Sequence, residues 1–440
     1  MIDSNSFRKR RNLFLDYLDD RAAIIPAAEL VPHHADCEYP FRQNSDFWYL
    51  TGFDEPEAIA LFLPYKPKSE RFVLFVLPKD SVLEVWQGVR SGTEGAIDHY
   101  GADISHPLSE FPNLIGEYLK GSKGIVFRIG KHPKIEEIVL KTWADQLNSY
   151  SRVGSAPLSI SAPCSYLHKM RLVKDLEEIE RMREASVISA EAHELARKST
   201  KPGMNERFIQ GIIEQHFLSK NTRGPAYGSI VAGGDNACVL HYTSNNDLLR
   251  DGDLLLIDAG CSLNDYYNGD ITRTFPINGR FTSAQRDLYQ IVLEAQMAAI
   301  DIAITGNSTE EIHLKALKIM VEGLIELGLL IGNSESIIEK GDYRHLYMHK
   351  TGHWLGLDVH DVGAYRMGDY EVKLEAGMVL TVEPGLYISD RIPVPDGQPE
   401  IEDRWKGIGI RIEDNILVDD YCPEVLSIKA LKSIEDMEQK

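Results

Sequence analysis

The stretch that most constrains the fold of this chain is residues 254–274. An apolar run ends in Asp258, and Asp270 opens a second β-prone run twelve residues later. The Asn-Asp pair between them favours a turn, so the sequence predicts a β-hairpin with the two aspartates roughly opposite each other. Opposed residues have Cβ atoms about 4.5–5.5 Å apart, and carboxylates that close repel each other unless they share a proton or a cation. The alternative is that the strands are offset and both acids face solvent.

Charge and cysteine usage exclude several classes of function. The chain has 47 Lys and Arg against 67 Asp and Glu, and its net charge of −20 argues against nucleic acid or an anionic membrane as a partner. Its five cysteines are scattered and form no CxxC pair, which predicts a reducing compartment and no thiolate metal site. We find no run of about 18 apolar residues and no signal-like segment, so we expect a cytoplasmic protein without a membrane span.

The first part of the chain, residues 1–172, is expected to be a mixed α/β domain. Helical patterns at 7–19 and 114–119 alternate with short apolar runs typical of buried strands. The runs lie at 22–25, 58–63, 72–77 and 124–127. Residues 151–172 are rich in Ser, Gly and Pro and have little periodicity, so we place the domain boundary there.

Residues 173–440 form the second expected domain. Asp175 and Glu178 have the spacing of a capping box, which predicts that a long helix starts there. Further helices are expected at 205–219, 283–304 and 308–328, and strands at 227–232 and 238–242 and within 345–430. Helices, strands, helices and strands in this order favour an α+β fold with helices on one face of the sheet over a doubly wound sheet.

Three histidines gather in the last third of the chain. His349, His353 and His360 are interleaved with Gly352 and Gly356, and glycine lets the backbone approach a site closely. A lone histidine is more often structural, but three within twelve residues indicate a site. The H-x3-H spacing alone could suggest zinc, but the glutamate of HExxH is absent.

Two further acids follow. Glu383 ends an apolar run before Pro-Gly, where it either points into a cleft or is a solvated turn acid. Arg411 and Glu413 lie two residues apart in a strand pattern, so they share one face; they could also be an ordinary surface ion pair. Counted with the two aspartates, four carboxylates and one histidine lie at strand ends or faces. Four ionised carboxylates need cations to share a cleft, and two divalent ions, held about 3.5–4 Å apart in such sites, would balance their charge.

These motifs resemble the pita-bread metallopeptidases, which include methionine aminopeptidases, prolidases and Xaa-Pro aminopeptidases. The resemblance covers nearly the whole chain and is strongest to the Xaa-Pro aminopeptidase (aminopeptidase P) group. It is carried by YPFRQNSDFWYLTGFDEPEA (39–58), HYT (241–243), DITRTFP (270–276), GHWLGLDVHDVG (352–363), LTVEPGLY (380–387) and GIGIRIED (407–414).

The resemblance implies an N-terminal domain of the creatinase/prolidase type and a C-terminal pita-bread fold with a dinuclear metal centre. The implied ligands are Asp258, Asp270, His353, Glu383 and Glu413. One departure is visible, because the two aspartates are 12 residues apart where the family usually has 11. We expect the extra residue to lie in the turn at 262–267 and the metal pair to be intact.

The implied function is release of the N-terminal residue from peptides with proline in second position, through a hydroxide that bridges two divalent ions. The oxygen-rich ligand set with one imidazole suits manganese, iron or cobalt better than a structural zinc, and we expect two divalent ions with manganese favoured. Glu383 would accept and pass on the proton, His360 would stabilise the oxyanion, and His241 would position the substrate and handle the proline nitrogen. In the substrate-binding site, His349 would line the proline pocket, and Tyr387 and Arg411 would orient the ligands.

Other functions remain open at this point. A prolidase would cleave only Xaa-Pro dipeptides with the same metal site. A non-catalytic peptide-binding protein and a metal-free creatinase-like hydrolase are also compatible with this fold, although all five ligand positions are filled here. The family resemblance further implies a homodimer or homotetramer.

Overall fold

The computed structural model describes residues 2–389 and 391–438. Two compact units divide the chain, residues 2–171 and the residues from 172 onward. Within the described residues, none of the helices combines the length and apolar character that a membrane crossing requires.

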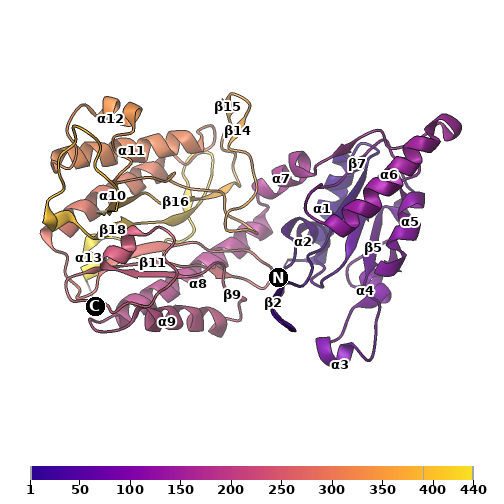
Figure 1. The fold of residues 1–440 in the computed structure, drawn as a ribbon, viewed down its shortest axis with the longest axis horizontal. Coiled ribbons are helices and arrows are strands. Elements are labelled where there is room, and N and C mark those ends of the chain that lie inside the picture. The colour runs from indigo at the N-terminus through magenta and orange to yellow at the C-terminus, as the bar shows by residue number, and fades with distance from the viewer. Residues whose placement is uncertain (1, 390, 439–440) are drawn as a thin grey trace. The chain divides into compact units, whose positions relative to one another are not determined.

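The N-terminal unit is built on a six-stranded mixed sheet with the order β6-β5-β4-β1-β7-β8 (Figure 1). The strands are β1 (Ala22–Pro26), β4 (Ile59–Phe62), β5 (Phe72–Val76), β6 (Ile104–Pro107), β7 (Ile125–Val126) and β8 (Ile160–Ser161). β4 pairs antiparallel with β1 and β5, whereas the β1–β7, β5–β6 and β7–β8 pairs are parallel. A short separate ribbon joins β2 (Pro32–His34) and β3 (Cys37–Glu38).

Helices cover both faces of this sheet. Side chains alternate between the two faces along each strand, so neighbouring residues of one strand pack against different helices. Leu61 and Val73 belong to a core cluster with Phe111 and Ile115 of one helix group, whereas Phe62 packs edge-on against Phe14 of the first helix on the other face. The helices are α1 (Ser4–Tyr17), α2 (Ser45–Thr51), α3 (Glu84–Gln87), α4 (Gly92–Asp98), α5 (Phe111–Tyr118), α6 (Pro133–Val153) and α7 (Cys164–Leu172).

The expected strands of this unit are confirmed as β1, β4, β5 and β7, but several helices were not predicted, among them α6 and α7. α6 buries Val139 and packs Ile135, Ile138 and Trp143 partly against the core. Its ends do carry signals, with Pro133 in the first turn and Gly154 in the left-handed conformation after the last turn. α7 occupies part of the segment expected to be irregular.

The C-terminal unit contains several small antiparallel sheets. β10 (Ile230–Gly233), β11 (Leu254–Asp258) and β13 (Thr272–Pro276) form one; β16 (Val379–Val382), β19 (Asp414–Leu417) and β20 (Glu424–Val425) form another; and β17 (Gly385–Ile388) pairs with β18 (Ile408–Arg411). A single bridge between Thr272 and Glu413 joins the strands of the first sheet to the segment between β18 and β19. Short ribbons join β9 (Gly224–Pro225) to β12 (Cys261–Ser262) and β14 (Arg366–Met367) to β15 (Tyr370–Glu371).

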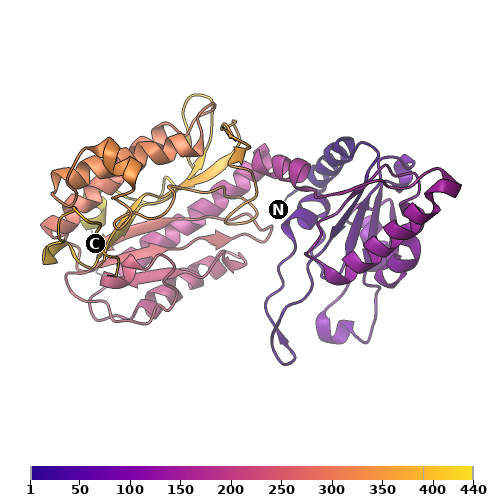
Figure 2. The same ribbon diagram turned by 45° about the horizontal axis from the view of Figure 1, so that its top comes forward.

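The same unit contains two pairs of helices that pack against each other, α8 with α9 and α10 with α11 (Figure 2). The helices are α8 (Leu176–Ser199), α9 (Glu206–Ser219), α10 (Ser283–Asp301), α11 (Thr309–Glu326), α12 (Ser334–Lys340) and α13 (Ile434–Glu438). The predicted capping box is confirmed, because Asp175 and Glu178 each bond the other's backbone N–H. α10 packs on β16, β17 and β18, the strands next to two of the expected ligands.

The predicted hairpin at 254–274 is confirmed, but its register is offset. Asp258 pairs with Thr272, and Asp270 lies two residues before that position. Residues that differ by two along an extended chain can point to the same side, so the offset still allows the two carboxylates to meet. The turn closes at Leu263 and Tyr267, which share a backbone hydrogen bond of 2.9 Å.

The strand predicted at 238–242 is wrong. Its start belongs to a 3₁₀ helix, η3 (Gly234–Cys238), and turns follow it. η3 packs directly on β18, where a Cβ at Gly409 would lie 2.4 Å from the Ala237 carbonyl oxygen. Ala237 is buried in this contact, whereas Val239 is exposed and Cys238 and Leu240 are only partly buried, so this apolar run does not have the burial of a core strand.

Candidate metal centre

The five predicted ligands all lie in the C-terminal unit, on strand ends or on segments next to strands. Asp258 is the last residue of β11, Asp270 precedes β13, His353 lies on a segment that bonds to β16, Glu383 follows β16, and Glu413 lies between β18 and β19.

The structure brings the ligands together. One donor atom each from Asp270, His353 and Glu413 lies within 4.8 Å of the others. His353 Nε2 is 3.4 Å from Asp270 Oδ2 and 3.5 Å from Glu383 Oε1. Asp258 is linked to Asp270 because both contact the hydroxyl of Tyr227. The strands are offset, as the alternative for the two aspartates proposed, but its second part is wrong because neither acid faces solvent. The solvated-turn alternative for Glu383 is wrong as well.

Glycines allow two pairs of backbone segments to come this close. A Cβ at Gly260 would lie 1.7 Å from the Gly269 carbonyl oxygen, and one at Gly352 would lie 2.0 Å from that of Thr381. Any other residue would push apart the segments that carry neighbouring ligands.

The imidazole of His353 is held with one nitrogen free for a metal. Its Nδ1 lies 3.0 Å from the Trp354 carbonyl oxygen, which accepts the ring N–H and leaves Nε2 as the electron-pair donor. Thr381 Oγ1 accepts from the His353 backbone N–H and donates to Glu383 Oε1 at 3.3 Å. One threonine thus sets the orientation of two candidate ligands.

Tyr227 connects the two aspartates, a role that the sequence did not predict. Its hydroxyl lies 2.5 Å from Asp258 Oδ1 and also contacts Asp270 Oδ1. The ring is far from both in sequence and lies just before β10, and no motif signal marked it. Burial, together with the charges of the two aspartates, raises the pKa of this phenol well above its usual value, so Tyr227 keeps its proton.

Asp258, Glu383 and Glu413 have raised pKa values. Burial is the main cause for Asp258, Glu383 and Glu413, and the pKa of Glu383 is raised to about 7. For His353, burial favours the neutral ring, but the hydrogen bond to Asp270 and the charge of Glu383 outweigh it and raise its pKa to about 9. The protein thus gathers more negative charge than its own cations balance.

Arg411 is the main protein cation in the cluster, and it is 4% exposed. It donates to Asp258 Oδ2 at 2.6 Å, to the Tyr387 hydroxyl at 3.0 Å and to Thr272 Oγ1 at 3.1 Å. The prediction that Arg411 and Glu413 share one face is confirmed, because Thr272 Oγ1 also donates to Glu413 Oε2 at 2.7 Å. The surface ion-pair alternative is wrong, since both side chains are buried.

The remaining histidines border the cluster. His349 Nε2 lies 2.8 Å from the Tyr387 hydroxyl, and burial and the nearby charge of Arg411 lower the His349 pKa to about 3. The His360 ring centroid is 4.3 Å from that of His353. His241 is exposed, and its charge acts on both His349 and His360. The structure therefore places His349 and His360 at the edge of the cluster.

The residues fit divalent cations. A nearby positive charge lowers the pKa of a carboxyl group, so cations among these acids would reverse the effect of burial that is seen for Asp258, Glu383 and Glu413. Hard oxygen donors with one imidazole are the ligands that ions such as Mn²⁺ accept. The arrangement can therefore hold metal ions and, next to them, groups able to donate or accept protons.

Comparisons with known proteins agree with this geometry. A model of metallopeptidase family M24 matches residues 180–420, and one of the aminopeptidase P N-terminal domain matches residues 7–127. A Haemophilus influenzae Xaa-Pro aminopeptidase is 41% identical over 438 residues, covering 99% of this chain and 97% of that protein. The Escherichia coli K12 Xaa-Pro aminopeptidase is 40% identical over 439 residues, with coverage of 99% and 97%. The solved structure of a Pseudomonas aeruginosa aminopeptidase, PepP, matches with a TM-score of 0.94 at 39% identity, covering 99% of this chain and 97% of that one. The expected fold class, an aminopeptidase P-type N-terminal domain and a pita-bread domain, is confirmed.

Proposed function

The chain belongs to metallopeptidase family M24, and we propose that it acts as an Xaa-Pro aminopeptidase, releasing the N-terminal residue from peptides with proline in second position. The observation that carries the proposal is the convergence of four carboxylates and His353 at the strand ends of the C-terminal unit. Relatives that match the chain over nearly its whole length carry the same activity in their names.

We propose two divalent cations as cofactor, with Mn²⁺ as the native metal. Their ligands would be Asp258, Asp270, His353, Glu383 and Glu413. Two such ions balance the charge of four carboxylates, and this oxygen-rich set is typical of Mn²⁺ sites. Bound there, the ions would supply a nucleophilic water at neutral pH and polarise the scissile carbonyl.

Glu383 is the proposed proton carrier. A carboxylate held next to the attacking water can accept its proton and pass it on. Thr381 and His353 hold its Oε1 at 3.3 and 3.5 Å, so the carboxylate has a fixed position. Its proton would pass to the proline nitrogen as the peptide bond breaks.

Histidines are proposed to hold the substrate. His360 would donate a hydrogen bond to the oxyanion, and His241 would position the substrate and assist the leaving nitrogen. His349 donates from Nδ1 to the Lys350 carbonyl, 2.8 Å away, and its Nε2 accepts from Tyr387. Because its lowered pKa keeps the ring neutral, His349 offers a largely apolar wall to a proline ring.

The acidic cluster also explains the position of cleavage. The free amino group of a peptide is cationic, and a carboxylate-rich centre attracts it. Binding of that group at the metal centre limits the enzyme to the first peptide bond. Prolidase activity, restricted to Xaa-Pro dipeptides, is the second candidate function, because the same cluster would serve it.

Hydrolysis of two substrates tests the proposal. We expect Mn²⁺-loaded protein to cleave an Xaa-Pro-Yaa tripeptide, to cleave an Xaa-Pro dipeptide poorly, and to lose activity with a chelator. The reverse preference would establish a prolidase. Metal binding without cleavage of either substrate would refute the peptidase proposal in favour of peptide binding.

Assembly, location and domain roles complete the proposal. The segment around Trp86 exposes Val85, Trp86 and Val89 by more than 80% each, which supports a subunit contact in a homodimer or homotetramer. The described cysteines form no disulfide, which supports a cytoplasmic location. The division into residues 1–172 and 173–440 is proposed as the functional one. Light scattering of the purified protein and fractionation of cells test the first two statements.

A further inference from the structure

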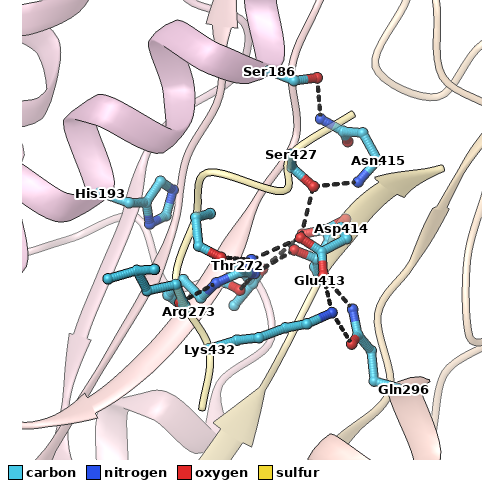
Figure 3. A network of polar contacts seen from close by, with 12 residues as sticks. Ser186, His193, Thr272, Arg273, Gln296, Glu413, Asp414, Asn415, Ser427 and Lys432 are labelled. Atoms are coloured by element: carbon cyan, nitrogen blue, oxygen red, sulfur yellow. Dashed lines mark hydrogen bonds and ion pairs between the residues drawn. The ribbon is translucent and has the colours of Figure 1, made fainter. Parts of the chain in front are cut away.

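A buried polar network lies directly behind the metal ligand Glu413 (Figure 3). At its centre is Arg273, which is 3% exposed. Arginine has five N–H donors in a planar fork, and here all five are used. The Leu431 and Ala430 carbonyls accept at 2.9 and 2.7 Å, and the Asp414 carboxylate accepts at 2.7 Å.

The two remaining N–H donors of Arg273 bind backbone carbonyls of residues that border the metal centre. One nitrogen, Nη1, donates to the Thr272 carbonyl at 2.8 Å and to the Glu413 carbonyl at 2.6 Å. These carbonyls belong to two different strand segments, which are bridged at Thr272 and Glu413 and are also joined by hydrogen bonds between the Thr274 hydroxyl and the Arg411 backbone. One guanidinium therefore fixes the point at which the segment that carries Asp270 crosses the segment that carries Glu413.

The crossing of the Thr272 and Glu413 segments is also stabilised on the side that faces the metal cluster. Side chains alternate along extended backbone, so Thr272 and Glu413 face the metal cluster while Arg273 and Asp414 face away from it. In front, Thr272 Oγ1 donates to Glu413 Oε2 at 2.7 Å. Glu413 therefore accepts two stabilising hydrogen bonds. Its carboxylate accepts one from Thr272 on the cluster side, and its backbone carbonyl accepts one from Arg273 on the opposite side.

Asp414 anchors the guanidinium. Its two oxygens accept four hydrogen bonds, and the carboxylate is fully buried. Oδ1 accepts from Arg273 and, at 2.6 Å, from Ser427; Oδ2 accepts from Gln296 and Lys432, both at 2.7 Å. The carboxylate cannot shift without breaking several of these bonds, so Arg273 has a rigid counter-ion.

We propose that Arg273 and Asp414 are positioning residues of the metal centre, which hold Glu413 and Asp270 at the separation that two metal ions require. The pair touches neither substrate nor metal and acts through the backbone of Thr272 and Glu413. The proposal rests on the proposed function only through the metal ions, because it concerns how the ligands are held. Groups that orient metal ligands typically change metal affinity or activity by about 10–100-fold when replaced.

The N-terminal unit offers a matched control. Arg171 is also buried, and it donates to Asp46 at 2.7 Å. We would compare Arg273→Lys with Arg171→Lys, and Asp414→Asn with Asp46→Asn. Lysine keeps the charge but cannot serve five acceptors in a plane, and asparagine keeps the shape but removes the charge. If Arg273→Lys fails to fold, the milder Asp414→Asn decides.

Titration of chelator-stripped protein with Mn²⁺ is the main measurement, and thermal unfolding, EPR of the bound Mn²⁺, kcat and KM accompany it. We expect Arg273→Lys and Asp414→Asn to weaken at least one Mn²⁺ site by about 10–100-fold and to lower kcat by a similar factor, with KM changed far less. The EPR spectrum of the Mn²⁺ pair should change as well. The two controls should lower the unfolding temperature and leave the Mn²⁺ affinities unchanged.

Wild-type Mn²⁺ affinities and kcat in both Arg273→Lys and Asp414→Asn would overturn the proposal. Equal losses of Mn²⁺ affinity in the controls would overturn it too, because the effect would then be one of general stability. If the wild type binds two ions but does not cleave the tripeptide, the proposed function fails while the titration still decides the role of Arg273. A wild type that binds no Mn²⁺ would overturn both.

Discussion

Replacement of Tyr227 by phenylalanine removes a single oxygen from the centre of the cluster. That oxygen contacts both Asp258 and Asp270, and phenylalanine offers no donor in its place. A hydrogen bond to a charged group contributes about 1.5–3 kcal/mol. At about 1.4 kcal/mol per factor of ten, its loss corresponds to roughly 10–100-fold in metal affinity.

The assay is titration of chelator-stripped Tyr227→Phe protein with Mn²⁺, followed by kcat/KM for an Xaa-Pro-Yaa tripeptide. Tyr65→Phe is the control, because the Tyr65 hydroxyl also makes a buried hydrogen bond, to the Tyr118 carbonyl at 2.6 Å, but lies in the N-terminal unit. We expect weaker Mn²⁺ binding and lower kcat/KM in Tyr227→Phe alone. Wild-type affinity for both ions would refute the idea that the phenol holds the two aspartates in place.

Three further predictions follow from the site and its surroundings. Glu383→Gln should keep its fold by circular dichroism and lose about 10²–10⁴-fold in kcat, because the proton carrier is gone; turnover near that of the wild type would contradict the role. Mn²⁺ at a hundred times its Kd should raise the free energy of unfolding by about 2.7 kcal/mol per site, and a chelator should reverse the rise in a denaturant titration; identical curves with and without metal would contradict a folded-state metal site. Burial lowers the pKa of His313 to about 4 from 6.5, so the unfolded chain binds a proton between these pH values that the folded protein does not. Stability should therefore rise by up to about 3 kcal/mol from pH 4 to 6.5, and His313→Gln should flatten this rise in urea titrations; an unchanged slope would count against a neutral, buried His313.

The convergence of the proposed ligands could be predicted because several of them leave a local mark in the sequence. Asp258 and Glu383 end apolar runs, and Glu413 shares a strand face with Arg411. Such patterns reflect backbone geometry over a few residues, which sequence periodicity reports well. The family resemblance then selected His353 from three histidines, which spacing alone could not do.

Tyr227 and the Arg273–Asp414 pair were missed for the opposite reason. Their roles depend on contacts across 31 to 141 residues of sequence, and no local pattern records such distances. Asp414 also reads as the polar residue of an ordinary alternating strand. The false strand at 238–242 has a different cause, because a short apolar run does not have to be buried: Val239 is exposed, and Cys238 and Leu240 are only partly buried.

The hydrogen bonds from Arg273 to the Ala430 and Leu431 carbonyls affect the order in which the site forms during synthesis. The ribosome makes all five ligand residues before it makes Ala430, Leu431 and Lys432. A growing chain that has already exposed every ligand still lacks two carbonyls that saturate Arg273 and the ammonium group that pairs with Asp414. The crossing at Glu413 therefore gains its full set of hydrogen bonds only after translation has passed residue 432. The last residues to be made thus complete the support of a cluster whose members are all made earlier.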